Sequence, residues 1–162
     1  MPRESGPSGA CREMGIVPLS RAKHMDDDHR KGVVAVIERD GRWLMIRRAV
    51  GIKAAGWWCF PGGGIEPRED PRVALVREIR EEVGLDVAVE RLLWHWQKPD
   101  GSLSLSWWKV RLADADQQPV CNPNEVAEAR WVAPTDLRRL EPLLPNNLEF
   151  CEAYLDGRLV CE

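Results

Sequence analysis

The chain has 162 residues and a formal net charge of −3, with no long apolar run. This length suffices for one domain with its own core. The slightly negative charge gives no general attraction to nucleic acid or to an acidic membrane. Five scattered cysteines without C-x-x-C spacing favour free thiols in a reducing cytoplasm over disulfides or a zinc site. We therefore expect a cytoplasmic protein with neither nucleic acid nor membrane as a partner.

Residues 1–30 differ in composition from the rest of the chain. They are rich in Gly, Pro, Ser and charged residues and have no periodic apolar face, which predicts a disordered N-terminal extension. The apolar segment at residues 15–19 contains a proline and is too short for the core of a signal peptide. We expect one folded domain at residues 31–162.

The domain begins with strands. Val33 to Ile37 is a continuous apolar run, as expected for a strand buried on both faces. Asp40-Gly41 then predicts a hairpin turn into a second strand. After a glycine-rich loop and a central helix, the pattern predicts a hairpin around residues 99–101, a polar loop at 113–124, a strand in EVAEARWV, and helices at 134–140 and 147–155. This order predicts an α+β domain in which helices pack on the faces of a mixed sheet.

The central helix is predicted between Asp70 and Gly84. Asp70 is a favourable N-cap, Pro71 suits the first helical position, and Gly84 is a typical C-terminal residue. At about 100° per residue, an apolar stripe and an acidic face lie on roughly opposite sides of the helix. The stripe contains Val73, Val76, Ile79 and Val83, and the acidic face contains Glu78, Glu81 and Glu82.

Three carboxylates this close together repel one another and weaken a helix. One interpretation is a solvated acidic face. The other is a site for Mg²⁺, which prefers oxygen ligands and is held by carboxylates together with substrate phosphates. More than one such ion could bind to this face.

The spacing of the whole segment resembles the signature of the Nudix hydrolases. The pattern runs Gly63, five residues, Glu69, seven residues, Arg77-Glu78, Ile79, one residue, Glu81-Glu82, one residue, Gly84-Leu85. The resemblance covers about residues 32–156 and implies the Nudix α/β/α sandwich, with a loop–helix–loop that holds Mg²⁺ or Mn²⁺. It also implies cleavage of a diphosphate in a nucleoside diphosphate linked to another group.

The same resemblance implies roles for individual residues. Metal ligands would be Glu78, Glu81 and Glu82, supported by Glu69 and Arg77. Gly63, at the metal loop, would allow a tight turn, because glycine tolerates positive φ. An additional acid outside the segment would be Glu125 or Glu128, and either could instead face solvent.

WWCFPGGGIE resembles the entry into this segment in the MutT-like branch, which removes oxidised nucleoside triphosphates such as 8-oxo-dGTP. Trp57, Trp58 and Phe60 are therefore candidates for substrate binding, although most tryptophans pack in cores. LLPNNLEF resembles the place where these enzymes put an asparagine against the purine. Asn147, or less favourably Asn146, would read the base; the alternative is an ordinary turn and N-cap.

Three functional hypotheses follow. The first is a MutT-like (d)NTP pyrophosphatase that releases a nucleoside monophosphate and pyrophosphate. The second is a Nudix hydrolase for ADP-ribose, a dinucleotide or a nucleotide sugar. The third is a nucleotide-binding domain without activity, which the intact glutamate set argues against. In each case the partner is a small nucleotide, and the protein is expected to be a monomer or homodimer.

Overall fold

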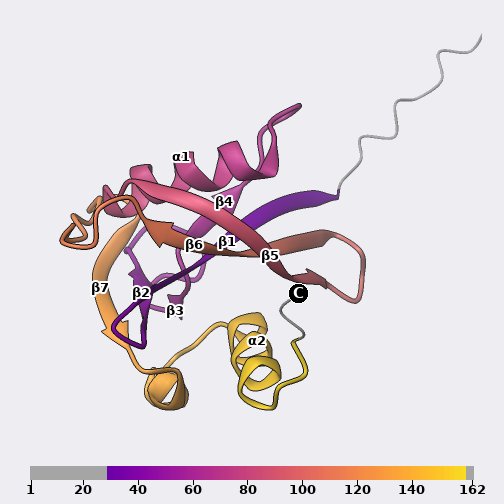
Figure 1. Ribbon diagram of the computed structural model, residues 1–162. Helices are drawn as coiled ribbons and strands as arrows, with labels where there is room; N and C mark the ends of the chain where they lie inside the picture. The colour runs from indigo at the N-terminus through magenta and orange to yellow at the C-terminus, as the bar shows by residue number, and fades with distance from the viewer. Residues whose placement is uncertain (1–28, 160–162) are drawn as a thin grey trace, which may run out of the picture.

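The computed structural model describes residues 29–159. A mixed β-sheet lies between α1 on one face and η1 and α2 on the other (Figure 1). The elements are β1 (Arg30–Arg39), β2 (Arg42–Arg48), β3 (Trp58–Cys59), β4 (Gly62–Gly64), α1 (Pro71–Val83), β5 (Val87–Gln97), β6 (Leu103–Leu112), β7 (Val126–Val132), the 3₁₀ helix η1 (Pro134–Arg139) and α2 (Pro145–Leu155). The predicted α+β sandwich is confirmed. Residues 1–28, nearly all of the predicted extension, lie outside the described residues.

Strand β1 is the centre of the sheet. It pairs with β6 in parallel and with β2 and β4 in antiparallel orientation. The remaining pairs place β5 beside β6, and β3 and β7 beside β2. The β1–β2 turn is formed by Asp40 and Gly41, with φ of 52° and 70°, as expected for a type I′ hairpin. The central position explains the continuous apolar run predicted for β1, since both of its faces are covered.

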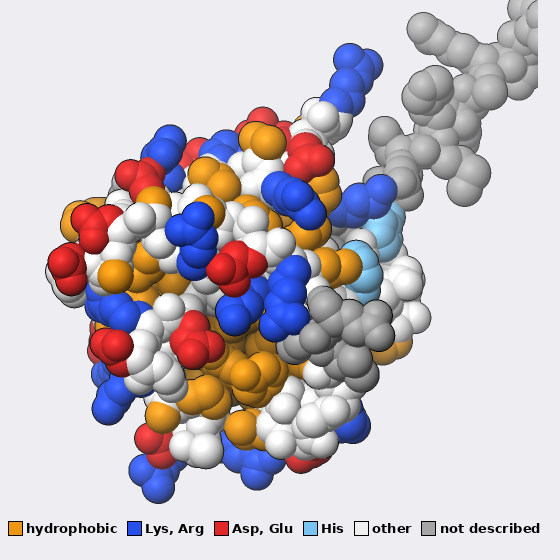
Figure 2. Space-filling view, in the orientation of Figure 1, with side chains coloured by type: hydrophobic (Ala, Val, Ile, Leu, Met, Phe, Trp, Pro, Cys, Tyr) orange, Lys and Arg blue, Asp and Glu red, His pale blue; other side chains and the backbone are white. Residues whose placement is uncertain are grey.

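Two hydrophobic cores lie on opposite faces of the sheet. Val33, Ala35 and Ile37 of β1 contribute to the core under α1, while Val34 and Val36 contribute to the core under α2. The second core is aromatic and includes Trp43, Phe60, Trp107 and Phe150. Figure 2 shows hydrophobic side chains in a hollow on the α2 side, below the charged surface near α1.

Helix α1 has the predicted ends. The Asp70 side chain accepts a hydrogen bond from the Arg72 N–H, and Gly84 ends the helix in a left-handed conformation with φ of 63°. Among residues 29–159, no helix is both long and apolar enough to cross a membrane.

The predicted apolar stripe of α1 is partly wrong. The buried residues are Ala74, Leu75, Ile79, Glu82 and Val83, whereas Val73 is 60% exposed. Because the buried face is centred near Leu75, Ile79 and Glu82, Val73 lies about 160° from Leu75 around the helix. One carboxylate therefore belongs to the buried face, and the acidic and apolar faces are not opposite.

Candidate active site

Three consecutive glycines form β4, which lies between β1 and α1. A Cβ atom at Gly62 would overlap the carbonyl oxygen of Val33, and a Cβ atom at Gly63 would overlap the carboxylate of Glu78. Gly64 has free space around it. The predicted reason for glycine at 63 is wrong, because Gly63 is not among the positive-φ glycines. It is required because the carboxylate packs directly against its backbone.

The structure brings together carboxylates from α1 and from the segment before β7. Oxygens of Glu78, Glu82 and Glu125 all lie within 4.8 Å of one another. Glu82 is only 5% exposed, and its Oε2 accepts a hydrogen bond of 2.9 Å from the Gly62 N–H. We call Glu78, Glu82 and Glu125 the carboxylate group. Its third member is Glu125, one of the two acids that the sequence left open.

Burial and mutual repulsion shape the charge of this group. Burial, with smaller contributions from Glu78 and Glu125, raises the pKa of Glu82 from 4.5 to about 8, although the Gly62 hydrogen bond opposes the shift. Burial also raises the pKa of Glu78, against the influence of Arg77. Buried carboxylates are costly unless paired or bound to a cation. A set made only of carboxylate oxygens fits a hard divalent cation such as Mg²⁺.

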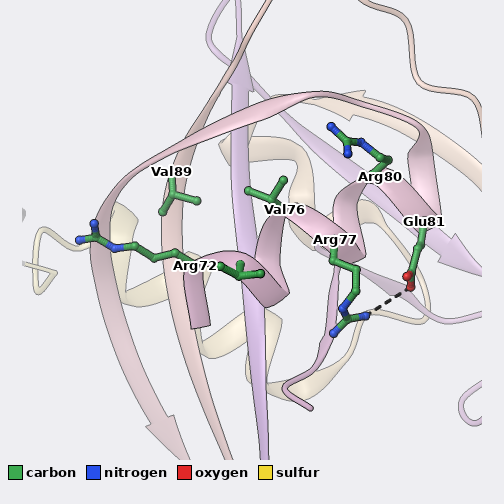
Figure 3. A pocket seen from close by; sticks show the side chains of 7 residues that line it. Arg72, Val76, Arg77, Arg80, Glu81 and Val89 are labelled. Carbon is green, nitrogen blue, oxygen red and sulfur yellow. Dashed lines mark hydrogen bonds and ion pairs between the residues drawn. The ribbon is translucent and has the colours of Figure 1, made fainter. Parts of the chain in front are cut away.

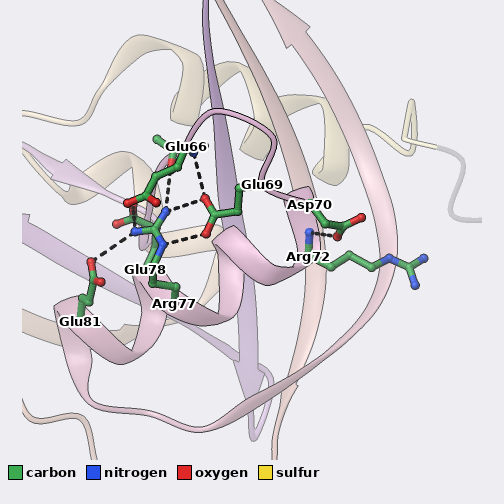
Figure 4. A network of polar contacts seen from close by, with 8 residues as sticks. Glu66, Glu69, Asp70, Arg72, Arg77, Glu78 and Glu81 are labelled. Carbon is green, nitrogen blue, oxygen red and sulfur yellow. Dashed lines mark hydrogen bonds and ion pairs between the residues drawn. The ribbon is translucent and has the colours of Figure 1, made fainter.

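Arg77 connects the loop before α1 to the helix (Figure 4). Its guanidinium donates to both oxygens of Glu69 at 2.8 and 2.9 Å, to Glu78 at 2.8 Å, and to the carbonyl oxygen of Gly64 at 3.0 Å. The Glu69 carboxylate also accepts from the Glu66 N–H. These contacts lower the pKa of Glu69 to about 2. The bidentate geometry is specific to arginine, so Arg77 braces Glu78 while Glu69 stabilises the loop.

Glu81 lies outside the carboxylate group. Half of its side chain is exposed, and one oxygen lies 3.3 Å from the Arg77 guanidinium. It borders an open hollow of about 530 Å³ between α1 and β5, which is shown in Figure 3. The other residues around this hollow are Arg72, Val73, Val76, Arg77, Arg80 and Val89. The Glu81 side chain therefore lies on the outer side of the helix and does not point toward the Glu82 carboxylate.

The aromatic candidates have different environments. Trp58 and Phe60 are 5% and 3% exposed, whereas Trp57 is half-buried. The guanidinium groups of Arg47 and Arg130 lie 5.9 and 4.9 Å from the centre of the Trp58 ring. Trp58 and Phe60 thus pack in the core under α2, and Trp57 is the more accessible of the three.

The remaining two candidates are both bonded within the protein. Glu128 forms ion pairs with Arg47 and Arg130. Asn147 is 3% exposed, its Oδ1 accepts from the Phe60 N–H at 2.8 Å, and its Nδ2 donates to Asn146. The N-cap alternative for Asn147 is wrong, since α2 begins with Leu144 as its N-cap.

Arg48 was not identified from the sequence. It lies near enough to Glu82 to lower the pKa of that carboxyl group, and its Nε donates to the Lys53 carbonyl oxygen. In the sequence, the only sign that Arg48 lies near the carboxylate group is its position at the end of a predicted strand that precedes the glycine segment. The neighbouring Cys59 is buried, which raises the pKa of its thiol to about 12, in agreement with the predicted packing role.

The fold and the acidic loop–helix–loop define a class of enzyme. Residues 28–154 match the family model described as NUDIX domain. The chain therefore belongs to the Nudix family and is a Nudix hydrolase, a pyrophosphohydrolase that acts on nucleotide derivatives.

Relatives with assigned activities support this class. The CTP pyrophosphohydrolase of Escherichia coli (strain K12) is 35% identical over 125 residues, which are 76% of this chain and 89% of that protein. The 8-oxo-dGTP diphosphatase of Proteus vulgaris is 34% identical over 77 residues, or 46% of this chain and 69% of that protein. The crystal structure of a MutT Nudix hydrolase from Burkholderia pseudomallei is 29% identical with a TM-score of 0.58, covering 76% of this chain and 95% of that one.

Proposed function

We propose that the carboxylate group binds a divalent cation, Mg²⁺ or Mn²⁺, and that the enzyme hydrolyses a nucleoside triphosphate to a monophosphate and pyrophosphate. The proposal depends on one observation above all, the approach of Glu78, Glu82 and Glu125 to within 4.8 Å beneath the glycine segment. Glu81, on the outer side and held by Arg77, is proposed as an additional ligand for a second ion.

The bound cation would offset negative charge on the diphosphate oxygens. Water attacks one phosphorus of the anhydride, the bond from this phosphorus to the bridging oxygen breaks, and the proton of the water passes to a carboxylate. Arg77 keeps Glu78 in place through its hydrogen bond of 2.8 Å. The Gly62 N–H does the same for Glu82 at 2.9 Å. These fixed donors reduce the motion of the carboxylates during the reaction.

We propose CTP or dCTP as the first substrates to test, ahead of 8-oxo-dGTP. The similarity to the CTP pyrophosphohydrolase covers 76% of this chain and 89% of that relative, while the similarity to the 8-oxo-dGTP diphosphatase covers 46% of this chain and 69% of that relative. The amide of Asn147, expected to read a purine, is bonded to Phe60 and Asn146. Trp57, which is half-buried, is the proposed aromatic contact for the base.

A substrate screen with Mg²⁺ tests this proposal. It compares CTP, dCTP, 8-oxo-dGTP, ADP-ribose and a nucleotide sugar, and it measures pyrophosphate separately from orthophosphate. We expect pyrophosphate from the triphosphates, and a loss of at least about 100-fold in kcat for Glu82→Gln, the lower end of a positioned carboxylate's contribution. Turnover of only ADP-ribose or the nucleotide sugar would contradict the proposal that nucleoside triphosphates are the substrates. Tight binding with no turnover of any compound would contradict the enzymatic proposal.

A further inference from the structure

Strand β3 lies between β2 and the segment that precedes α2. On that second side, the Trp58 N–H donates to the carbonyl oxygen of Pro142 at 2.7 Å. The Leu144 N–H then donates to the carbonyl oxygen of Trp58 at 3.0 Å. These two bonds form a parallel bridge between Trp58 and Leu143. The segment before α2 is thus a short parallel neighbour of β3.

The next bond of a parallel ladder is missing for a local reason. Continued pairing would give the Phe60 N–H the carbonyl oxygen of Leu144 as its acceptor. That oxygen instead accepts from the N–H groups of Asn147 and Leu148, because α2 begins there. The side-chain Oδ1 of Asn147 takes its place and accepts from the Phe60 N–H at 2.8 Å. A buried N–H requires a partner, and this side chain supplies it from the first turn of α2.

The bond to Phe60 leads directly to the carboxylate group. The carbonyl oxygen of Pro61, the next residue, accepts from the Ala35 N–H of β1 at 2.8 Å. The Gly62 N–H, one residue further, donates to Glu82 at 2.9 Å. Between Asn147 and Glu82 there is consequently a backbone segment of three residues with a hydrogen bond at each residue.

We propose that Asn147 is a positioning residue for the carboxylate group. It fixes the backbone at Phe60 from the α2 side, so that the Gly62 N–H points at Glu82 and Gly63 remains against Glu78. The arrangement couples α2 to the metal-binding face of α1, although the two helices lie on opposite faces of the sheet (Figure 1). The catalytic consequence rests on the proposed function, whereas the structural coupling does not.

Two substitutions separate this role from base reading. Asn147→Asp retains an oxygen acceptor for the Phe60 N–H, and Asn146 can turn its NH₂ group toward the second oxygen. Asn147→Leu has similar bulk and removes the acceptor. Asn146→Ala is the matched control, because it removes the partner of Nδ2 and leaves the bond to Phe60 intact.

The first readout is hydrogen exchange of the Phe60 and Gly62 amides in the full-length, metal-free protein. The second is Mn²⁺ affinity measured by calorimetry. For Asn147→Leu we expect both amides to exchange at least about tenfold faster, as for a buried N–H that loses its acceptor, and Mn²⁺ to bind about tenfold more weakly. Asn147→Asp and Asn146→Ala should remain within about threefold of wild type in both measurements.

Nucleotide kinetics complete the test. We expect Asn147→Leu to lower kcat with little change in KM, and Asn147→Asp to restore kcat. Equal increases in KM for Asn147→Asp and Asn147→Leu, with unchanged Gly62 exchange, would overturn the proposal in favour of base reading. Unchanged Gly62 exchange and Mn²⁺ affinity in Asn147→Leu would overturn it as well. Should Asn147→Leu not fold, weak Mn²⁺ binding by a folded Asn147→Asp would refute the proposal. Because exchange needs no substrate, it tests the coupling even if the proposed function fails.

Discussion

Replacing Glu82 by glutamine should stabilise the metal-free protein at neutral pH while abolishing activity. Glutamine has nearly the same shape and can still accept the Gly62 hydrogen bond through its Oε1. It removes only the ability to carry a negative charge at a position that is 5% exposed. The substitution therefore measures the cost of burying this charge, to which the neighbouring Glu78 and Glu125 add a smaller part.

The magnitude follows from the pKa of Glu82, which is raised from 4.5 to about 8 in the folded protein. The folded state keeps a proton that the unfolded state releases between these values, so stability falls as pH rises through this window. At about 1.4 kcal/mol per pKa unit, the accumulated loss is about 3 kcal/mol at pH 7 and increases until about pH 8. Glu82→Gln should remove this component of the pH dependence.

Urea unfolding in EDTA from pH 5 to pH 8.5 measures this effect. In EDTA, the wild-type free energy of unfolding should fall with pH more steeply than that of Glu82→Gln. When Mg²⁺ replaces EDTA, the wild-type protein should become the more stable of the two, because it binds the ion. Glu81→Gln is the matched control, because Glu81 is half exposed and lies outside the carboxylate group; it should keep the wild-type slope. Equal slopes for wild type and Glu82→Gln would refute the assigned electrostatic cost.

Three further substitutions test separate parts of the site. Gly63→Ala should displace the Glu78 carboxylate and weaken Mn²⁺ binding in calorimetry. Gly64→Ala is the control, because a Cβ atom at Gly64 has free space around it, and this variant should bind Mn²⁺ as the wild type does. Equal Mn²⁺ affinities of the two variants would contradict the steric argument. Arg77→Lys keeps the charge but loses the bidentate contact with Glu69, so kcat should fall about tenfold or more. An Arg77→Lys variant with the kcat of the wild type would show that charge alone suffices. Asp70→Ala removes the helix cap and should cost about 1 kcal/mol in urea unfolding with kcat unchanged; a large loss of activity would indicate that Asp70 has a role beyond capping.

Local patterns in the sequence predicted the fold because each has a direct physical cause. Asp40-Gly41 supplies the positive φ values of the β1–β2 turn, and Asp70 with Gly84 defines both ends of α1. The apolar run in β1 corresponds to a strand covered on both faces. These features depend on neighbouring residues and hence can be read without tertiary information.

The details of the site depended on contacts between distant segments. A helical wheel identifies neighbouring residues but does not reveal which side faces the sheet, so Val73 was predicted as buried and Glu82 as part of a separate acidic face. Glu125 and Glu128 were equivalent by sequence, and only the pairing of β7 with β2 places Glu125 near Glu82. The acceptor role of Asn147 requires knowledge of where α2 begins relative to β3, which no local pattern contains.

The central claim is that a divalent cation binds among Glu78, Glu82 and Glu125. Anomalous diffraction from crystals soaked in Mn²⁺ tests it most directly. We predict a peak in contact with oxygens of these three side chains, at about 2.1 Å, and its loss in Glu82→Gln crystals. A fully active enzyme whose crystals show no Mn²⁺ between these carboxylates would contradict the account.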